Sequence, residues 1–84
     1  WLPAIERFKP QMIFVSAGFD AHRDDPVGAL DLETEDYIEL TRIVRDVAAV
    51  HAAGRVVSVL EGGYNTSALA GSVELHLREL LATD

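Results

Sequence analysis

QMIFVSA, at Gln11–Ala17, decides the fold together with a second apolar run, RVVSVL, at Arg55–Leu60. Both runs have the length and the β-branched content of strands, and each leads into a loop that contains glycine. Neither run alternates apolar with polar residues cleanly, which favours strands that are covered on both faces, as in a parallel sheet. We therefore expect two neighbouring parallel strands.

A helix is expected between the two strands, over Thr34–Ala53. Thr34 can cap its N-terminus, and Gly54 follows where a helix C-terminus favours a residue with positive φ. One face of this helix is formed by residues at helical spacing: Tyr37, Leu40, Val44, Val47, Ala48 and His51. Strand, helix and strand then make one βαβ unit, whose crossover should be right-handed.

Two further helices are expected at the ends of the chain. Trp1–Phe8 is interpreted as the tail of a helix that ends before Pro10. A last helix, over Thr66–Ala82, can be capped by Asn65. Its inward face consists of Leu69, Val73, His76, Leu77 and Leu80. The expected fold class is therefore α/β, a parallel βαβ unit plus a C-terminal helix, in one domain over residues 1–84.

The bulk composition narrows the class of protein. The 84 residues carry a net charge of −7, contain no cysteine and are 49% apolar. These values indicate a globular domain, exclude disulfides and thiolate metal ligands, and argue against binding to a nucleic-acid backbone. No apolar run approaches the roughly 20 residues of a membrane span, and we expect a cytoplasmic protein. The chain begins at Trp1 without an initiator methionine, so we expect a fragment.

Two strands make a poor sheet. About three or more strands, or firm helix packing, are needed for independent stability. Two or three helices are also too few to cover both faces of two apolar strands. We therefore expect missing structure, supplied either by an upstream segment or by a second copy of the chain in a homo-oligomer.

Two loops lie beyond the carboxyl ends of the strands, where parallel α/β sheets place their sites. The first contains Asp20 and the second is EGGYN, at Glu61–Asn65. Asp20 is a hard oxygen donor that can hold a zinc ion, or it simply accepts hydrogen bonds from nearby backbone amides. The hydroxyl of Tyr64 can stabilise a developing oxyanion, or its ring packs over the end of the sheet. If the strands are neighbours, both side chains approach one point.

The other polar residues give weaker signals. The long, irregular loop Gly18–Glu33 holds four aspartates, and within it Asp24–Pro26 is typical of a turn. Gly62-Gly63 before a helix resembles a weak phosphate cradle for a small anion, but the lysine and the Ser/Thr of a P-loop are missing.

Three histidines are candidates for metal ligands by residue type alone. His22 lies two residues from Asp20, but a lone loop histidine is more often a solvent-facing side chain than a ligand. His51 and His76 lie within the expected helices, away from the strand ends, and are expected to be structural.

Together these motifs resemble the C-terminal section of histone deacetylases and the related bacterial deacetylases. The resemblance runs from Lys9 onward and rests on four features in order: VSAGFDAHRDDPVGAL (Val15–Leu30), the pattern Tyr37…Leu40-Thr41, GRVVSVLEGGYN (Gly54–Asn65) and HLREL (His76–Leu80). The LEGGYN form, with Glu61, is closer to the class II-like branch. The resemblance implies an arginase-like, three-layer α/β fold. It also implies hydrolysis of an acetylated amine, either acetyl-lysine or an acetylpolyamine, with a zinc ion held by two aspartates and one histidine.

The resemblance assigns roles to individual residues. Asp20 matches the second zinc aspartate, and Tyr64 matches the tyrosine that stabilises the oxyanion. Four residues match the substrate-binding surface: Gly62 and Gly63 beside the tyrosine, and Pro26 and Val27 near the rim of the acyl-lysine tunnel. His22 falls in a variable stretch and matches no ligand.

Other parts of the family's site match nothing in these 84 residues. They are a D-x-H motif that supplies two zinc ligands and a histidine pair that transfers protons. Since catalytic zinc sites usually need three protein ligands, we expect this chain alone to be inactive and to bind zinc weakly or not at all. The alternative is a stand-alone truncated α/β module for assembly or interaction, without catalysis.

Overall fold

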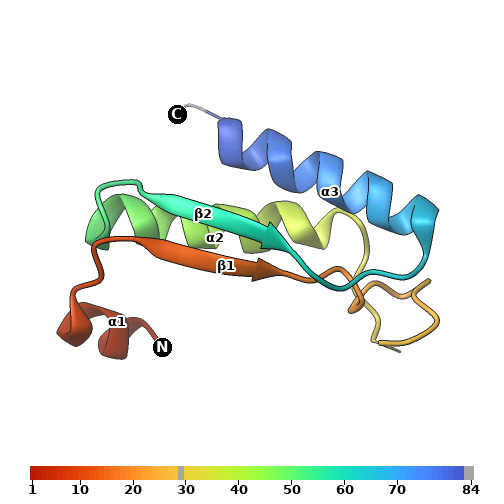
Figure 1. The fold of residues 1–84 in the computed structure, drawn as a ribbon, viewed down its shortest axis with the longest axis horizontal. Helices are drawn as coiled ribbons and strands as arrows, with labels where there is room; N and C mark the ends of the chain where they lie inside the picture. The colour runs from red at the N-terminus through yellow and green to blue at the C-terminus, as the bar shows by residue number, and fades with distance from the viewer. Residues whose placement is uncertain (29, 83–84) are drawn as a thin grey trace.

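A computed structural model describes residues 1–28 and 30–82. The elements follow in the order α1 (Leu2–Phe8), β1 (Ile13–Ala17), α2 (Asp36–His51), β2 (Val56–Leu60) and α3 (Thr66–Leu81) (Figure 1). Ala29 in the expected long loop, and the last two residues of the expected domain, lie outside the described residues. The expected order of elements is confirmed, with each element one or two residues shorter at its ends.

The two strands form a parallel pair, as expected. Their register runs from Ile13 opposite Val56 to Ala17 opposite Leu60. Because the strands are parallel and in register, their carboxyl ends lie at the same edge of the sheet. The α/β class is therefore confirmed, and so is the common edge on which the expected site depends.

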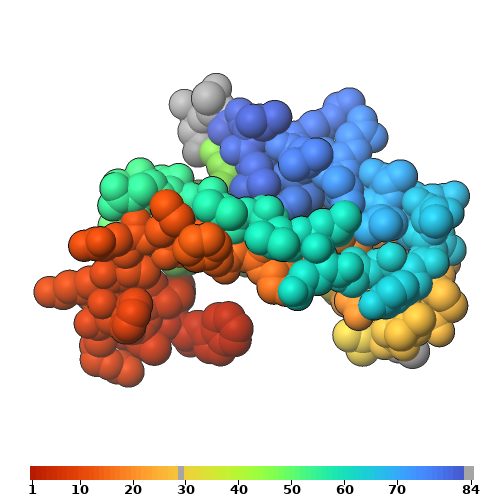
Figure 2. Space-filling view, in the orientation of Figure 1, coloured from red at the N-terminus to blue at the C-terminus, as the bar shows by residue number. Residues whose placement is uncertain are grey.

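Coverage of the sheet differs from the expectation of two buried faces. Val15 and Ser58 are partly buried beneath the helices, whereas Phe14 and Val59 on the other face are 70% and 52% exposed. Figure 2 shows the strands at the molecular surface in this view. Within the described residues the helices α2 and α3 pack on one face, and the apolar residues of the opposite face remain in contact with solvent.

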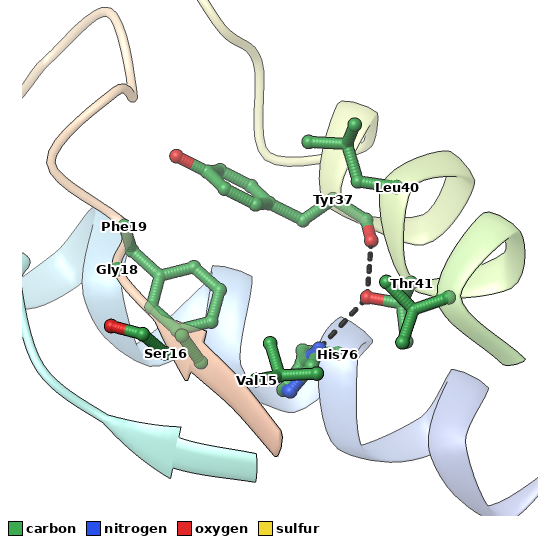
Figure 3. A pocket seen from close by; sticks show the side chains of 10 residues that line it. Val15, Ser16, Gly18, Phe19, Tyr37, Leu40, Thr41 and His76 are labelled. Carbon is green, nitrogen blue, oxygen red and sulfur yellow. Dashed lines mark hydrogen bonds between the residues drawn. The ribbon is translucent and has the colours of Figure 1, made fainter. Parts of the chain in front are cut away.

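A buried histidine joins three elements on the covered face (Figure 3). The hydroxyl of Thr41 in α2 donates to the carbonyl of Tyr37 at 2.6 Å, so its oxygen is left to accept from Nδ1 of His76, 2.8 Å away. Nε2 of His76 then accepts from the Ser58 hydroxyl of β2 at 2.8 Å. Burial lowers the pKa of His76, which favours the neutral ring that this arrangement requires. The structural role expected for His76 is thus confirmed.

The inward faces expected for the two long helices are confirmed except for one leucine in each helix. Leu40 and Leu77 are 47% and 50% exposed, whereas the polar Thr41 and Ser72 are buried. In α2 the buried residues are Tyr37, Thr41 and Ala48, so Thr41 takes the place of Leu40 on the expected face. The reason is that His76 needs a hydrogen-bonding partner on the neighbouring helix, and Thr41 supplies it.

The helix ends confirm two of the three expected signals. Asn65 caps α3 by accepting from the amide of Ala68 at 3.0 Å, and Gly54 has a φ of 76° after α2. Thr34 does not cap α2: the N-cap is Glu35, without a side-chain bond. The Thr34 hydroxyl instead bonds to the ring of His22. No helix in the described ranges is long and apolar enough to cross a membrane.

Candidate active site at the carboxyl ends of the strands

The two loops that follow the strands are bonded to each other. The amide of Glu61 donates to the carbonyl of Ala17 at 3.1 Å, and the amide of Phe19 donates to the carbonyl of Gly62 at 2.8 Å. These bonds continue the parallel ladder beyond the strands, so the loops leave the sheet side by side (Figure 1). Asp20 and the glycine pair are thereby brought to one place.

The carboxylate of Asp20 lies against glycine backbone. A Cβ built on Gly62 would lie 3.1 Å from Cγ of Asp20 and 3.2 Å from each of its carboxylate oxygens, and one built on Gly18 would lie 3.2 Å from Oδ1. The side chain is half-buried, and none of the described residues donates a hydrogen bond to its oxygens. Among the described residues, none of its contacts is the backbone-amide bond of the alternative interpretation of Asp20.

A carboxylate that accepts no hydrogen bond from the described residues is suited to serve as one ligand of a metal ion, since a ligating oxygen needs its lone pairs free. It does not make a complete site. Among residues 1–28 and 30–82 there is no group of three or more His, Cys, Asp or Glu side chains that could hold a metal. Within the described part of the chain, Asp20 would therefore serve a metal ion as a single ligand.

Tyr64 is held through its backbone while its ring projects outward. Its amide donates to Oδ2 of Asp25 at 2.7 Å, and its residue surface is 56% exposed. This exposure argues against a ring buried over the end of the sheet, which was the alternative interpretation. Gly63 precedes it with a φ of 136°, and a Cβ there would lie 2.6 Å from a methyl of Leu69. Only glycine fits this turn without strain.

Asp25 organises both loops and was not singled out by the sequence. It is buried, and its Oδ1 accepts from the amides of Val27 and Gly28 at 2.8 and 3.0 Å, in addition to the bond from Tyr64 to Oδ2. Burial acts to raise the pKa of the Asp25 carboxyl, but the bonds from the amides of Gly28, Tyr64 and Val27 outweigh it, so the pKa is lowered. The pattern Asp25-Pro26-Val27-Gly28 was the available signal, since it is typical of a turn closed by an aspartate.

The expected substrate-binding residues lie around this framework. Pro26 and Val27 are exposed on the turn that Asp25 closes, Val27 by 65%. Gly62 contacts Asp20, as described above, and Gly63 directly precedes Tyr64. These four residues therefore lie in the two loops that Asp25 joins. Their contact with a substrate stays a prediction.

His22 is buried, not solvent-facing as expected. Its Nδ1 accepts from the amide of Asp24 at 3.1 Å, and its Nε2 lies 2.8 Å from the hydroxyl of Thr34. Both ring nitrogens are therefore engaged within the chain. His22 braces the long loop against the start of α2, and its contacts leave no nitrogen for a metal, in line with the expectation that it is not a ligand.

The long loop closes on itself at its base. The amide of Arg23 donates to the carbonyl of Leu32 at 2.7 Å, and the amide of Leu32 donates to the carbonyl of Ala21 at 3.0 Å. Gly28 then packs tightly against the backbone of Asp20, because a Cβ there would lie only 1.7 Å from the carbonyl oxygen of Asp20. The backbone of Asp20 is thus held from two sides.

Gly28→Ala is expected to lower the free energy of unfolding by about 1–3 kcal/mol, the usual cost of forcing extra atoms into a packed site. Equilibrium unfolding in urea measures this change in the free energy of unfolding. The matched control is Gly71→Ala in α3, whose new Cβ would make an ordinary 3.5 Å contact with a methyl of Thr34. This control should instead gain about 0.5–1 kcal/mol, because alanine favours helix over glycine. Equal effects of the two substitutions would contradict the tight contact at Gly28.

Fold and site together define an α/β protein with an exposed tyrosine at the carboxyl edge of a parallel sheet, close to a carboxylate that accepts no hydrogen bond from the described residues. Residues 1–80 match the family model described as the histone deacetylase domain, and the chain belongs to this family. The resemblance of the motifs is therefore confirmed.

Similar proteins agree with this assignment. The chain is 47% identical over 83 residues to the type-2 histone deacetylase 2 of Dictyostelium discoideum, covering 95% of this chain and 5% of that protein. It is 50% identical over 64 residues to the histone deacetylase-like amidohydrolase of Pseudomonas aeruginosa, covering 76% of this chain and 17% of that protein. The crystal structure of the HDA15 HD domain matches with a TM-score of 0.82 and 35% identity, over 95% of this chain and 22% of that one. The chain thus spans only a minor part of these relatives.

Proposed function

We propose that these residues are the C-terminal part of a deacetylase domain that hydrolyses acetylated amines, with Asp20 as one ligand of a catalytic zinc ion and Tyr64 as the group that stabilises the oxyanion. The observation that carries the proposal is the joining of two loops at one edge of the sheet. It sets a half-buried carboxylate, which accepts no hydrogen bond from the described residues, beside the loop of an exposed tyrosine.

Each side chain has a distinct task in this proposal. A bound zinc ion supplies Lewis acidity toward the amide carbonyl and lowers the pKa of its water. Asp20 contributes negative charge and a hard oxygen from a rigid strand end. Tyr64 directs its hydroxyl at the carbonyl oxygen, where negative charge develops as the tetrahedral intermediate forms. Neither residue is offered as the general base.

The remaining ligands and the proton-transferring groups belong, in this proposal, to a part of the full-length polypeptide outside these 84 residues. Two observations support this. The chain spans 5% and 17% of the relatives described above, and one face of its sheet exposes Phe14, Val57 and Val59. The same face would also suit a second copy of the chain.

The substrate class is an acetylated primary amine, either acetyl-lysine in a protein or an acetylpolyamine. Both present an N-acetyl group at the end of a flexible apolar stem. The name of the Pseudomonas relative, an amidohydrolase, supports the bond that is cleaved. It does not choose between the two amines.

Purified full-length polypeptide, loaded with zinc, is expected to release acetate from an acetyl-lysine peptide or from acetylspermidine, and to lose this activity on dialysis against a chelator. Acetate release, measured by an enzyme-coupled assay, gives the rate for each substrate. The 84-residue chain serves as the control and should release none. Hydrolysis of neither substrate by the zinc-loaded polypeptide would contradict the proposed function.

A further inference from the structure

We infer that Asp25 is a positioning residue that fixes the backbone of Tyr64 to the loop that carries Asp20. This inference rests on the proposed function, because it assigns to Asp25 a part in the reaction through Tyr64. The residue does not touch the substrate in this account, and its effect is exerted through the loop that holds the tyrosine.

The two carboxylate oxygens of Asp25 accept hydrogen bonds from different loops. Oδ1 of Asp25 accepts from Val27 and Gly28 within its own turn, at 2.8 and 3.0 Å. Oδ2 accepts from the amide of Tyr64, 39 residues further along the chain, at 2.7 Å. The side chain is only 6% exposed. A buried carboxylate that receives three amide bonds is strongly held in place, since each bond to an ionised acceptor is stronger than a neutral one.

The turn that Asp25 closes is itself packed on Asp20. Gly28, one of the two donors to Oδ1, lies against the carbonyl of Asp20 so closely that no side chain fits between them. A continuous path therefore runs from the backbone of Asp20, through Gly28 and the Asp25 carboxylate, to the amide of Tyr64. Any displacement of Asp25 moves the tyrosine relative to the aspartate.

Further bonds also join the two loops and have neutral carbonyl acceptors, among them the bond from the amide of Phe19 to Gly62. The side-chain amide of Asn65 donates to the carbonyl of Asp24 at 3.1 Å, in an exposed position. The bond from Asn65 does not involve Tyr64. If Asp25 is changed, the amide of Tyr64 therefore loses its acceptor. The bond to Asp25 is therefore the direct restraint on the tyrosine.

Asp25→Asn tests the bond to Tyr64 separately from the bonds within the turn. An asparagine keeps one oxygen, which can serve Val27 and Gly28, but its NH₂ group faces the amide of Tyr64 and cannot accept from it. The turn is preserved and the restraint on Tyr64 is lost. Asp24→Asn is the matched control, because it makes the same chemical change at the neighbouring residue, whose carboxylate is 60% exposed.

The test measures kcat and KM of the zinc-loaded full-length polypeptide with an acetyl-lysine peptide, for D25N, D24N, Tyr64→Phe and the double variant D25N/Y64F. D25N should lower kcat by roughly 10- to 100-fold, the cost of a misplaced catalytic group, with little change in KM and a full complement of zinc. In the Y64F background, D25N should lower kcat less than about 2-fold, because the hydroxyl that Asp25 positions is already absent. D24N should match the parent.

Three outcomes overturn the inference while leaving the role of Tyr64 intact. D25N could lower kcat equally in the parent and in the Y64F background, the D25N variant could lose its zinc, or D24N could lower kcat as much as D25N does. A Y64F variant with parental kcat overturns the role of Tyr64 itself, and the inference with it. If D25N does not fold, Asp25→Ser takes its place in the same cycle. A serine oxygen can still close the turn but is too short to reach both loops, so the same results are expected of it.

Discussion

Tyr64→Phe lowers kcat of the full-length polypeptide by roughly 10²–10³-fold in our account, with little change in KM. The magnitude is that of removing one preorganised donor to an oxyanion. KM is unaffected because the hydroxyl bonds most strongly in the transition state, when the carbonyl oxygen carries charge. Steady-state kinetics on an acetyl-lysine peptide measures both constants, and the zinc content of each preparation normalises the rates.

The chain contains its own control for this substitution. Tyr37 is the other tyrosine, its hydroxyl is buried, and it has no hydrogen-bond partner within the described residues. Burial raises the pKa of this hydroxyl, and the charges of Asp20 and Asp25 raise it further, so it is neutral at pH 7. Tyr37→Phe removes an unsatisfied group and should leave kcat unchanged, with stability equal or higher. Similar kinetics for the two variants would argue that Tyr64 has no catalytic role.

Asp20→Asn has the second large expected effect, the loss of bound metal. The substitution keeps the shape of the side chain but removes the negative charge that draws a cation to the strand end. Changes outside the first coordination shell already cost about 10- to 100-fold in metal affinity, so loss of a ligand should cost at least as much. Activity should fall in proportion to the zinc that remains.

Metal analysis after dialysis against buffered zinc measures the affinity of each variant. Asp31→Asn is the control, an identical change at an exposed residue of the same loop. It should bind zinc as the parent does, and circular dichroism should show the same helix content for all three proteins. Full zinc occupancy in the Asp20→Asn variant would exclude Asp20 from the coordination shell.

The order of elements could be predicted because it depends on local patterns. The two β-branched runs give strands, and the capping side chain of Asn65 marks the start of α3. Parallel pairing followed from the helix between the strands. With the strands parallel, the approach of the Asp20 loop to Gly62 followed as well, since both leave the same edge of the sheet.

Features that depend on partners distant in sequence could not be predicted. The hydrogen bonds of His76 turn Thr41 inward in place of Leu40, which hydrophobic periodicity cannot anticipate. Asp25 was correctly predicted to lie in a turn, but its bond to Tyr64 joins residues that only the fold brings together. For the same reason the burial of His22 could not be foreseen, since it requires Thr34 across the closed loop.

The central claim is that Asp20 and Tyr64 belong to one metal site at the edge of this sheet. Anomalous diffraction at the zinc absorption edge, from crystals of the zinc-loaded full-length polypeptide, tests it most directly. We predict an anomalous peak about 2.0–2.2 Å from a carboxylate oxygen of Asp20, with the hydroxyl of Tyr64 facing the same cavity. A zinc peak bound elsewhere, with the Asp20 carboxylate hydrogen-bonded only to protein, would contradict the account.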